Sequence, residues 1–278
     1  MLGFNEKNNI VVENGIAKAT SRLELRNICK TFNPGTPDAS TLFDNFNLTV
    51  DEGEFVSVIG SNGSGKTTIL NIICGSLAPD SGHIIFGGQD ITKMKEFRRA
   101  KHIGRVYQDP KAGTCSDLTI LENMALADNK NGFFGLTLGV NRKKINYYKE
   151  LLSVCEMGLE NRLNAKVGSL SGGQRQALAL VIANMTDLDM LILDEHTAAL
   201  DPKSSETLMH LTDKFVHRSK ITSLMVTHNL KYAIEYGNRL IMMHEGKCIV
   251  DIKGEEKKNA SVDDLLNIFN SISIEVGN

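Results

Sequence analysis

The stretch GSNGSGKTT at residues 60–68 constrains the fold of this chain more than any other. It follows an apolar run, EFVSVI at 54–59, and precedes a helix-favouring run, ILNIICGSL at 69–77. The pattern GxxxxGK(S/T) in this setting predicts a phosphate-binding loop that is entered from a buried strand and left through a helix. A chance glycine turn is the weaker explanation, because average residue usage gives such a string a probability of roughly 1% in a chain of this length.

Each part of this loop has a physical role in holding phosphates. The glycines let the backbone curl with its N–H groups turned inward, and the helix that follows adds the positive end of its dipole. We expect Lys66 to reach the β and γ phosphates as a mobile point charge, and the Thr67 hydroxyl to ligate Mg²⁺. The loop predicts that a nucleoside triphosphate is bound by Gly60, Ser61, Asn62, Gly63, Ser64, Gly65, Lys66, Thr67 and Thr68.

The composition excludes several classes of protein. A net charge of −2 gives no basic footprint, so nucleic acid is not favoured as a partner. The five cysteines are scattered without a CxxC pair, which argues against a disulfide framework or a zinc site and favours a reducing compartment. No apolar run is long enough for a transmembrane helix, and the N-terminus lacks the order of a secretory signal. Work at a membrane would therefore require another subunit to supply the spans.

The N-terminal part of the chain predicts a small β layer. Residues 1–21 are polar and mixed, and we expect a loose leader there. The segments LELRNICKTF and LFDNFNLTV alternate apolar and polar residues as half-buried strands do. They predict an antiparallel layer that feeds the buried strand before the phosphate loop.

The rest of the chain predicts helices around a parallel sheet. The strand HIGRVYQ should end at Gln108, and residues 109–187 should be mostly helical, with glycine-rich 129–139 as a core hairpin or loop, or else a partner contact surface. Apolar strands then alternate with amphipathic helices, which is typical of a parallel sheet covered on both faces. Residues 254–278 should form a charged spacer, KGEEKK, and an amphipathic helix capped by Ser261.

Two motifs downstream carry chemistry. LILDEH at 191–196 is an apolar strand that ends in two carboxylates, and we assign Asp194 to Mg²⁺ and Glu195 to the general base that deprotonates the attacking water. The alternative is a strand that simply ends in charged residues. In LSGGQRQ at 170–176, Ser171 and two glycines precede a helix expected from Gln174 to Met185, whose N-terminus is a second anion site or an ordinary capped helix end.

The phosphate loop, LSGGQRQ, LILDE, Asp201 and His228, in this order, resemble the ATP-binding subunit of a bacterial ABC transporter. The similarity covers roughly Leu23 to Asp251. The resemblance implies an α/β fold, a P-loop NTPase of the ABC cassette type with a RecA-like parallel sheet core. Its ATPase domain would span residues 22–253, with the N-terminal antiparallel β layer and a helical subdomain at about 109–187.

The resemblance also implies a head-to-tail dimer in which each ATP lies between the phosphate loop of one subunit and the LSGGQ stretch of the other. The chain agrees with the need for a second copy or a homologous ATPase subunit, because it carries each motif once and shows no internal repeat. The residues expected to contact the nucleotide from the partner side are Ser171, Gly172, Gly173 and Gln174.

Three further positions match functional residues of the family. Gln108 matches the glutamine that touches Mg²⁺ and the attacking water and links the site to the membrane subunit. His228 resembles the switch histidine that contacts the γ-phosphate and holds the base and water. Asp201 matches the aspartate of the loop after the base, and with Pro202 it is also a good helix N-cap. The other histidines have no such placement and are expected to be surface or core residues: His83, His102, His196, His210, His217 and His244.

Phe32 matches the aromatic residue that stacks on adenine in the family, with core packing as the alternative. Phe43 or Phe46 could take that place instead. The chain departs from the family at His196, where proline is usual and where the loop beside Glu195 could differ, and at Thr67, which keeps the hydroxyl of the commoner serine.

The strings DEHTAALDPKS and YGNRLIMMHEG resemble an importer-type bacterial subgroup found with a separate substrate-binding protein, some members resembling importers of tryptophan or other aromatic amino acids. The resemblance implies transmembrane permease subunits as partners and a peripheral place on the cytoplasmic face of the cell membrane. The alternatives are an exporter or lipoprotein-release ATPase, a soluble ABC protein that acts on ribosomes or DNA, and a nucleotide-sensing module without turnover.

Overall fold

We describe a computed structural model of the chain, in which residues 12–13, 16–17, 21–129 and 139–275 are described. An antiparallel sheet near the N-terminus has the strand order β4-β3-β6-β7. Its strands are β3 (Ser21–Phe32), β4 (Ser40–Asp51), β6 (Ser81–Phe86) and β7 (Gln89–Asp90). The alternating pattern buries one face, so the predicted antiparallel layer is confirmed. Most of the predicted leader lies outside the described residues; within it β1 (Val12–Glu13) pairs with β2 (Ile16–Ala17), and Ser21 already belongs to β3.

The central sheet has the order β12-β11-β5-β10-β9-β8. Its strands are β5 (Phe55–Gly60), β8 (Ile103–Val106), β9 (Met190–Asp194), β10 (Thr222–Val226), β11 (Arg239–His244) and β12 (Lys247–Lys253). All neighbours pair in parallel except β12, which returns antiparallel to β11. Every residue of β5, β9 and β10 is buried, as expected for parallel strands covered on both faces. The predicted strand HIGRVYQ is shorter than expected, because β8 ends at Val106 and Gln108 lies beyond it.

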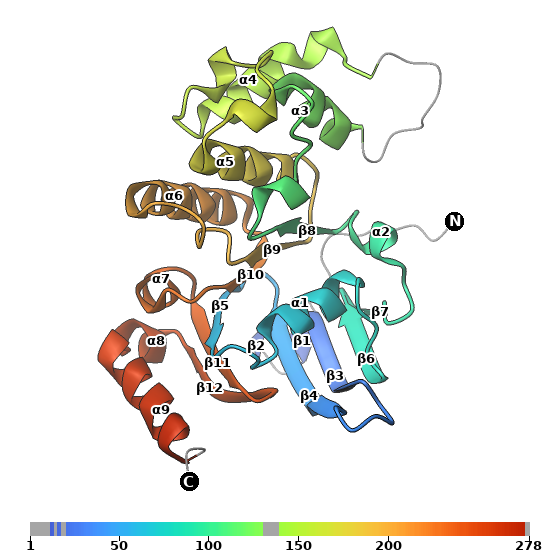
Figure 1. Cartoon of the computed structure of the whole chain (residues 1–278), viewed down its shortest axis with the longest axis vertical. Coiled ribbons are helices and arrows are strands. Elements are labelled where there is room, and N and C mark those ends of the chain that lie inside the picture. Colours follow the sequence, from blue (N-terminus) through green and yellow to red (C-terminus); the bar gives the residue numbers. More distant parts are fainter. Residues whose placement is uncertain (1–11, 14–15, 18–20, 130–138, 276–278) are drawn as a thin grey trace.

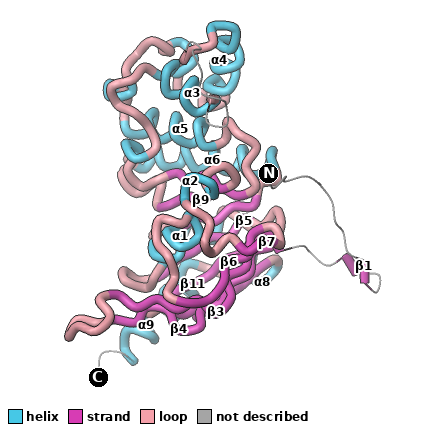
Figure 2. Tube along the Cα trace, turned by 90° about the vertical axis from the view of Figure 1, so that its right-hand side faces the viewer, coloured by secondary structure: helices cyan, strands magenta, loops and turns pink. Residues whose placement is uncertain are grey.

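The helices surround this sheet on several sides (Figure 1). They are α1 (Lys66–Cys74), α2 (Glu96–Arg99), α3 (Ile120–Asp128), α4 (Ile145–Ser153), α5 (Gly172–Ala183), α6 (Pro202–Ser219), α7 (Leu230–Glu235), α8 (Glu255–Asn259) and α9 (Val262–Glu275), with short 3₁₀ turns at Pro110–Ala112, Arg142–Lys144, Leu159–Asn161 and Val167–Ser169. Helices α3, α4 and α5 gather at one end of the molecule, and Figure 2 shows them well away from the antiparallel sheet.

Among the described residues, three buried cores hold these parts together. Helix α1 contributes Ile69 and Leu70 to a core shared by the antiparallel sheet and one face of the central sheet. On the other face, Tyr148 and Leu152 of α4 join α5 and α6 in a second core. The third core lies under α7 and α9.

The predicted charged spacer KGEEKK is largely helical, because α8 begins within it at Glu255. Lys257 of α8 is 2% exposed, and its Nζ donates to the carbonyls of Tyr236 at 2.5 Å and Gly237 at 2.7 Å. Ser261 caps α9 as predicted, since its hydroxyl accepts from the amide of Asp264 at 3.1 Å. The glycine-rich 129–139 segment lies almost wholly outside the described residues.

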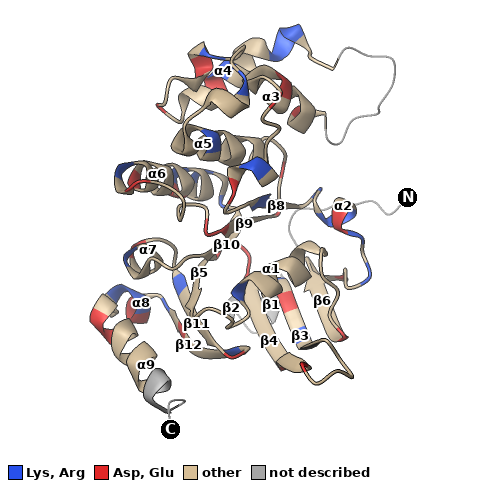
Figure 3. Ribbon diagram, in the orientation of Figure 1, with Lys and Arg blue, Asp and Glu red and all other residues tan. Residues whose placement is uncertain are grey.

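Basic and acidic residues are interspersed along the helices in Figure 3. Within the described ranges, no helix combines the length and the hydropathy needed to cross a bilayer.

Candidate active site

The predicted site residues gather where the parallel strands end. In register, Val58 of β5 lies beside Val226 of β10, and Val226 lies beside Asp194 of β9. Gly60, the last residue of β5, and Glu195 and His228, which come just after β9 and β10, therefore lie at one edge of the sheet. The carboxyl edge of such a sheet is where α/β proteins bind their ligands.

The phosphate loop needs glycine where the sequence has it. Gly65 caps α1 with φ +102°, and a Cβ there would lie 2.7 Å from the ring of the buried Phe43. A Cβ on Gly60 would lie 2.2 Å from the carbonyl oxygen of Met243 on the neighbouring strand. Larger residues would push the loop away from β4 and β11, so both glycines keep the backbone amides close to the start of the helix.

Lys66 lies within the loop instead of extending from it. Its Nζ donates to the carbonyls of Gly60 and Ser61 at 2.8 Å each, and the residue is 5% exposed. Burial lowers the pKa of Lys66, while the charge of Glu195 raises it. An ammonium group has three N–H donors, and these two contacts engage two of them. The hydroxyl of Ser64 is buried and has no hydrogen-bond partner within the described part of the chain. A cation and an unsatisfied hydroxyl in one glycine loop fit a phosphate ligand.

Glu195 is held in position by its backbone and its side chain. Its φ of +47° is in the left-handed region, and its amide donates to the carbonyl of Val226 at 3.0 Å. Oε1 of Glu195 lies 2.7 Å from Nε2 of His228, whose side chain is about half exposed. The predicted base and the predicted switch histidine therefore contact each other directly.

Asp194 is buried beside a residue that the sequence did not single out. Nη2 of Arg105, in β8, donates to Oδ2 of Asp194 at 2.6 Å. Burial lowers the pKa of Arg105, but the hydrogen bond and charge of Asp194 outweigh this effect and raise it. The available signal was a cation inside the otherwise apolar strand IGRV, where a charge needs a partner.

Gln108 is exposed in the segment after β8, while Thr67 is exposed in the first turn of α1. The segment before Gln108 is fixed by Gln176 of α5, whose Nε2 donates to the carbonyl of Tyr107 at 2.7 Å. Gln176 is 1% exposed and was not predicted as a site residue, although it is the second glutamine of LSGGQRQ.

The LSGGQ stretch forms a capped helix end. Ser171 accepts from the amide of Gln174 at 3.2 Å, and the Gln174 side chain accepts from the amide of Ser171 at 3.3 Å. Gln174 also donates to the carbonyl of Met157 at 3.2 Å, so its amide group is engaged within the helical part. The helix runs over Gly172–Ala183, starting and ending two residues earlier than predicted. Ser171 and Gly172 are exposed, and Gly173 is buried against Ser204 of α6.

Asp201 and Phe32 lie at the surface. Asp201 caps α6 by accepting from the amide of Ser204 at 3.0 Å, and this contact lowers the pKa of Asp201. Phe32 is 37% exposed at the end of β3, with Nζ of Lys30 5.9 Å from its ring centroid. Phe43 and Phe46 are core residues in contact with each other, so Phe32 is the aromatic of the three that is open to a ligand.

The histidines expected to be surface or core residues include one beside the loop. Nδ1 of His244, at the end of β11, lies 3.3 Å from Oγ of Ser61. His196 is 2% exposed, and its Nε2 donates to the hydroxyl of Thr212 in α6 at 3.1 Å. The position that usually holds proline in the family therefore ties the segment after Glu195 to α6.

We expect His196 to make the protein sensitive to acid. Complete burial lowers the pKa of His196 to about 4 from 6.5. As pH falls below the ordinary value, the unfolded chain binds a proton that the folded chain excludes, so stability that is present at neutral pH is lost. Between about pH 7 and about pH 5, the wild type should lose about 2 kcal/mol more free energy of unfolding than His196→Phe. Urea unfolding at both values measures this, with the exposed His217→Phe as the control that should behave like wild type.

Comparison with known proteins places the chain in a family. A family model described as ABC transporter matches residues 43–198. The chain is 45% identical over 247 residues to the tyrosine transport ATP-binding protein of Clostridioides difficile (strain R20291), which covers 89% of this chain and 98% of that protein. It is 32% identical over 229 residues to the putative hemin import ATP-binding protein of Staphylococcus haemolyticus (strain JCSC1435), covering 81% and 98%.

The fold agrees with these sequence matches. A solved dimeric ATP-binding cassette, in a post-hydrolysis state with ADP and Pi, superposes with a TM-score of 0.71 at 31% identity and covers 83% of this chain and 98% of that one. The family match spans more than half of the chain and includes the phosphate loop, LSGGQ and the Asp194–Glu195 pair. The chain therefore belongs to the ABC transporter family, as an ATP-binding subunit with the ATPase activity that this family couples to transport.

Proposed function

We propose that this chain is the ATP-hydrolysing, energy-coupling subunit of an importer for a small solute. The observation that carries the proposal is the contact between Glu195 and His228 at 2.7 Å, at the sheet edge where the buried cation Lys66 lies. A base held by a second side chain beside a phosphate loop suits hydrolysis better than nucleotide sensing alone.

In the proposed reaction, Glu195 orients a water and accepts its proton as the water oxygen bonds to the γ-phosphorus. The bond from that phosphorus to the β–γ bridging oxygen breaks, and ADP and phosphate result. His228 holds the carboxylate in place through Nε2 and lies at the exposed side of the pair. Lys66 supplies positive charge to the phosphates, where charge accumulates in the transition state.

A divalent cation fits the same edge. Thr67, Asp194 and Gln108 offer the hard oxygen donors that Mg²⁺ prefers, and Asp194 is buried at the end of β9, which β10 separates from the strand that enters the phosphate loop. When bound, Mg²⁺ would neutralise charge on the phosphate oxygens. Phe32, as an exposed aromatic beside Lys30, would stack on the adenine.

We further propose that the nucleotide site is completed by a second copy or a homologous subunit, with Ser171, Gly172 and Gly173 facing the γ-phosphate of the partner's ATP. Helices α5 and α1 lie apart in both Figure 1 and Figure 2, and the solved relative in its ADP and Pi state is dimeric. In the described residues, the hydrogen bonds of Ser171 and Gln174 stay within the helical part. The Gln174 side chain also matches a residue that contacts the nucleotide in the family. To contact the partner's ATP, its amide group would have to break its hydrogen bonds in the helix cap, or it would act by holding Ser171 in place.

Ser171→Ala should lower ATP turnover without changing ATP affinity of the monomer, because the hydroxyl would act on the partner's nucleotide. Calorimetry on dilute monomer and phosphate release at high protein concentration separate the two effects. The exposed Ser169→Ala, just before the motif, is the matched control. Loss of ATP binding by monomeric Ser171→Ala would show that the site is not shared between subunits.

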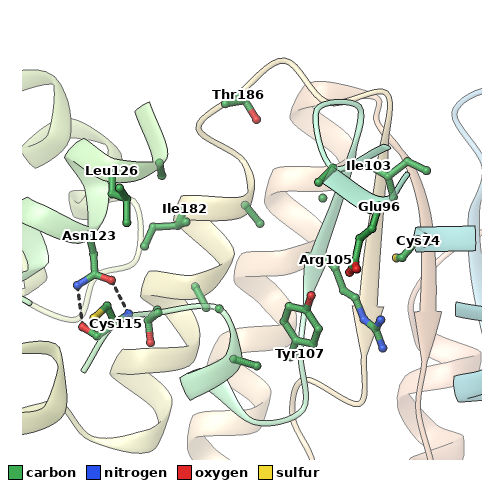
Figure 4. Close-up of a pocket in the computed structure, with 18 residues that line it drawn as sticks. Cys74, Glu96, Ile103, Arg105, Tyr107, Cys115, Asn123, Leu126, Ile182 and Thr186 are labelled. Carbon is green, nitrogen blue, oxygen red and sulfur yellow. Dashed lines mark hydrogen bonds between the residues drawn. The ribbon is translucent and has the colours of Figure 1, made fainter. Parts of the chain in front are cut away.

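A groove beside the site offers a docking surface for a permease. Its volume is about 690 Å³, and it lies between the strand β8 and the helices α3 and α5. Figure 4 shows Leu126 and Ile182 on one side of this groove and Arg105 and Tyr107 on the other. Leu126 is 58% exposed, so it offers apolar surface that a permease could bury. Because Gln108 directly follows Tyr107, an occupant of the groove would lie next to the proposed water and metal contact.

The direction and substrate of transport are also part of the proposal. The relative with 45% identity is named for tyrosine transport, and the sequence strings near 194–204 and 236–246 resemble importers of aromatic amino acids. We therefore infer import of tyrosine or a related aromatic amino acid, with a separate substrate-binding protein and a peripheral place on the cytoplasmic face of the membrane. The interspersed charges in Figure 3 do not suggest a nucleic-acid partner.

Co-purification tests these assignments together. Tagged Glu195→Gln protein, isolated from its native cells in mild detergent with ATP, should bring down a multi-spanning membrane protein and a substrate-binding protein. Tyrosine uptake by membrane vesicles that contain the recovered complex should require ATP. ATP-driven loss of tyrosine or of a lipoprotein from the vesicles would favour an exporter or release system, and recovery of ribosomes or DNA-bound factors would favour a soluble ABC protein.

A further inference from the structure

Arg105 connects two parts of the molecule that the proposed function treats separately. It lines the groove next to Tyr107, and its guanidinium lies 4.7 Å from the Tyr107 ring centroid. The same guanidinium donates to Asp194 at 2.6 Å and to the side-chain carbonyl of Asn71, in α1, at 2.9 Å. One side chain therefore reaches from the groove to both the proposed metal carboxylate and the helix that carries the phosphate loop. Figure 4 shows Arg105 and Tyr107 side by side at the groove.

The buried surroundings of Arg105 strengthen the effect of its charge on Asp194. The side chains of Arg105 and Asp194 are 10% and 11% exposed, so water screens their charges only weakly. Nε of Arg105 is buried without a hydrogen-bond partner within the described residues, which leaves the guanidinium incompletely satisfied in this position. The guanidinium is thus held at Asp194 by two acceptors and a ring, and its third donor adds no hydrogen bond to this position.

We propose that Arg105 is a positioning residue that competes with Mg²⁺ for the carboxylate of Asp194 and makes that competition depend on the groove. This inference rests on the proposed metal role of Asp194. With Arg105 on Asp194, much of the carboxylate's charge is neutralised, and the carboxylate attracts a divalent cation less strongly. An occupant of the groove that draws Arg105 or Tyr107 toward itself frees Asp194 for the metal. The groove and the nucleotide site thus share one cation.

The test measures how strongly Mg²⁺ favours nucleotide binding, without any turnover. For each variant, the dissociation constant of a non-hydrolysable ATP analogue is determined by calorimetry with EDTA and with excess Mg²⁺. The readout is the constant with EDTA divided by the constant with Mg²⁺, which is larger when Mg²⁺ favours binding more. Arg105→Gln should raise this ratio about tenfold, because it removes a positive charge next to the carboxylate. Arg105→Lys keeps the charge, and its ratio should stay within about twofold of wild type. Tyr107→Leu, changed from the groove side, should raise it about two- to fivefold through the lost cation–π contact.

Two further variants separate the inference from the function on which it rests. Asp194→Asn should bring the ratio close to one, and it should do so whether or not Arg105 is replaced. If Asp194→Asn leaves the ratio at the wild-type value, the metal role of Asp194 is wrong and the inference falls with it. If Asp194→Asn abolishes the ratio but folded Arg105→Gln leaves it unchanged, the metal role stands and the competition does not exist. Should Arg105→Gln fail to fold, an unchanged ratio in Tyr107→Leu overturns the inference.

Arg22→Gln is the matched control. Arg22 is a partly buried arginine that pairs with Asp189, just before β9 begins, whereas Asp194 ends that strand. Arg22→Gln removes the same charge as Arg105→Gln, but at more than a Debye length from Asp194. The ratio of dissociation constants for Arg22→Gln should therefore match that of the wild type. A rise equal to that of Arg105→Gln would mean that net charge, not the contact with Asp194, sets the ratio.

Discussion

Glu195→Gln should lower ATP turnover by about 10²–10⁴-fold, the usual contribution of a general base, while ATP binding survives. The amide has the shape of the carboxylate and accepts a hydrogen bond from His228, but it cannot take up the proton of the attacking water. Because hydrolysis is what reopens the proposed dimer, the variant should accumulate as an ATP-bound dimer. Phosphate release measures the first effect, and size-exclusion chromatography with ATP measures the second.

The control for this variant is Glu206→Gln, which neutralises an exposed carboxylate on α6 and should leave both measurements unchanged. Wild-type turnover in Glu195→Gln would remove Glu195 from its role. Slow turnover without dimer accumulation would support Glu195 as the general base, but it would contradict the proposal that hydrolysis reopens the dimer.

Lys66→Ala should weaken ATP binding by about 10²-fold or more, because charge-assisted hydrogen bonds to phosphate contribute about 1.5–3 kcal/mol each. The effect should be largest for ATP and small for adenosine, which lacks the phosphates that Lys66 contacts. Calorimetry with both ligands measures this difference. Lys66 is already buried within its loop, so bound phosphates would replace the carbonyls of Gly60 and Ser61 as its acceptors.

Lys258→Ala is the matched control, because it removes an exposed lysine of α8 and should bind ATP as wild type does. Unchanged ATP affinity in Lys66→Ala would contradict the phosphate role. An equal loss for adenosine and ATP would point to a collapsed loop instead of a lost charge.

The sequence predicted those parts of the site whose chemistry is local. GSNGSGKTT specifies its own backbone, since Gly60 and Gly65 meet neighbouring atoms that leave no room for a Cβ. Apolar strands that end in Asp194 and Glu195 place both at the carboxyl edge once the sheet is parallel. The exposure of Phe32, against the burial of Phe43 and Phe46, then separated three aromatics that the sequence had left as alternatives.

Contacts between distant segments were not predictable in this way. Arg105 meets Asp194 89 positions away, and Gln176 meets Tyr107 69 positions away, so only the packed fold shows these pairs. The charges of KGEEKK predict a spacer, and charged side chains usually face water. Lys257 instead buries its stem and gives its N–H donors to backbone carbonyls, a solution that composition does not reveal.

The left-handed backbone conformation at Glu195 makes some residue types more stable than others at this position. A residue with a Cβ costs about 1 kcal/mol there relative to glycine, and asparagine tolerates the same conformation better than glutamate does. Folding alone therefore favours glycine or asparagine at position 195, and only a carboxylate in use favours glutamate. In a lineage that kept the dimer but lost the need for turnover, drift at this position would make the protein more stable. A homologue with asparagine or glycine at position 195 is therefore expected to have lost ATP hydrolysis.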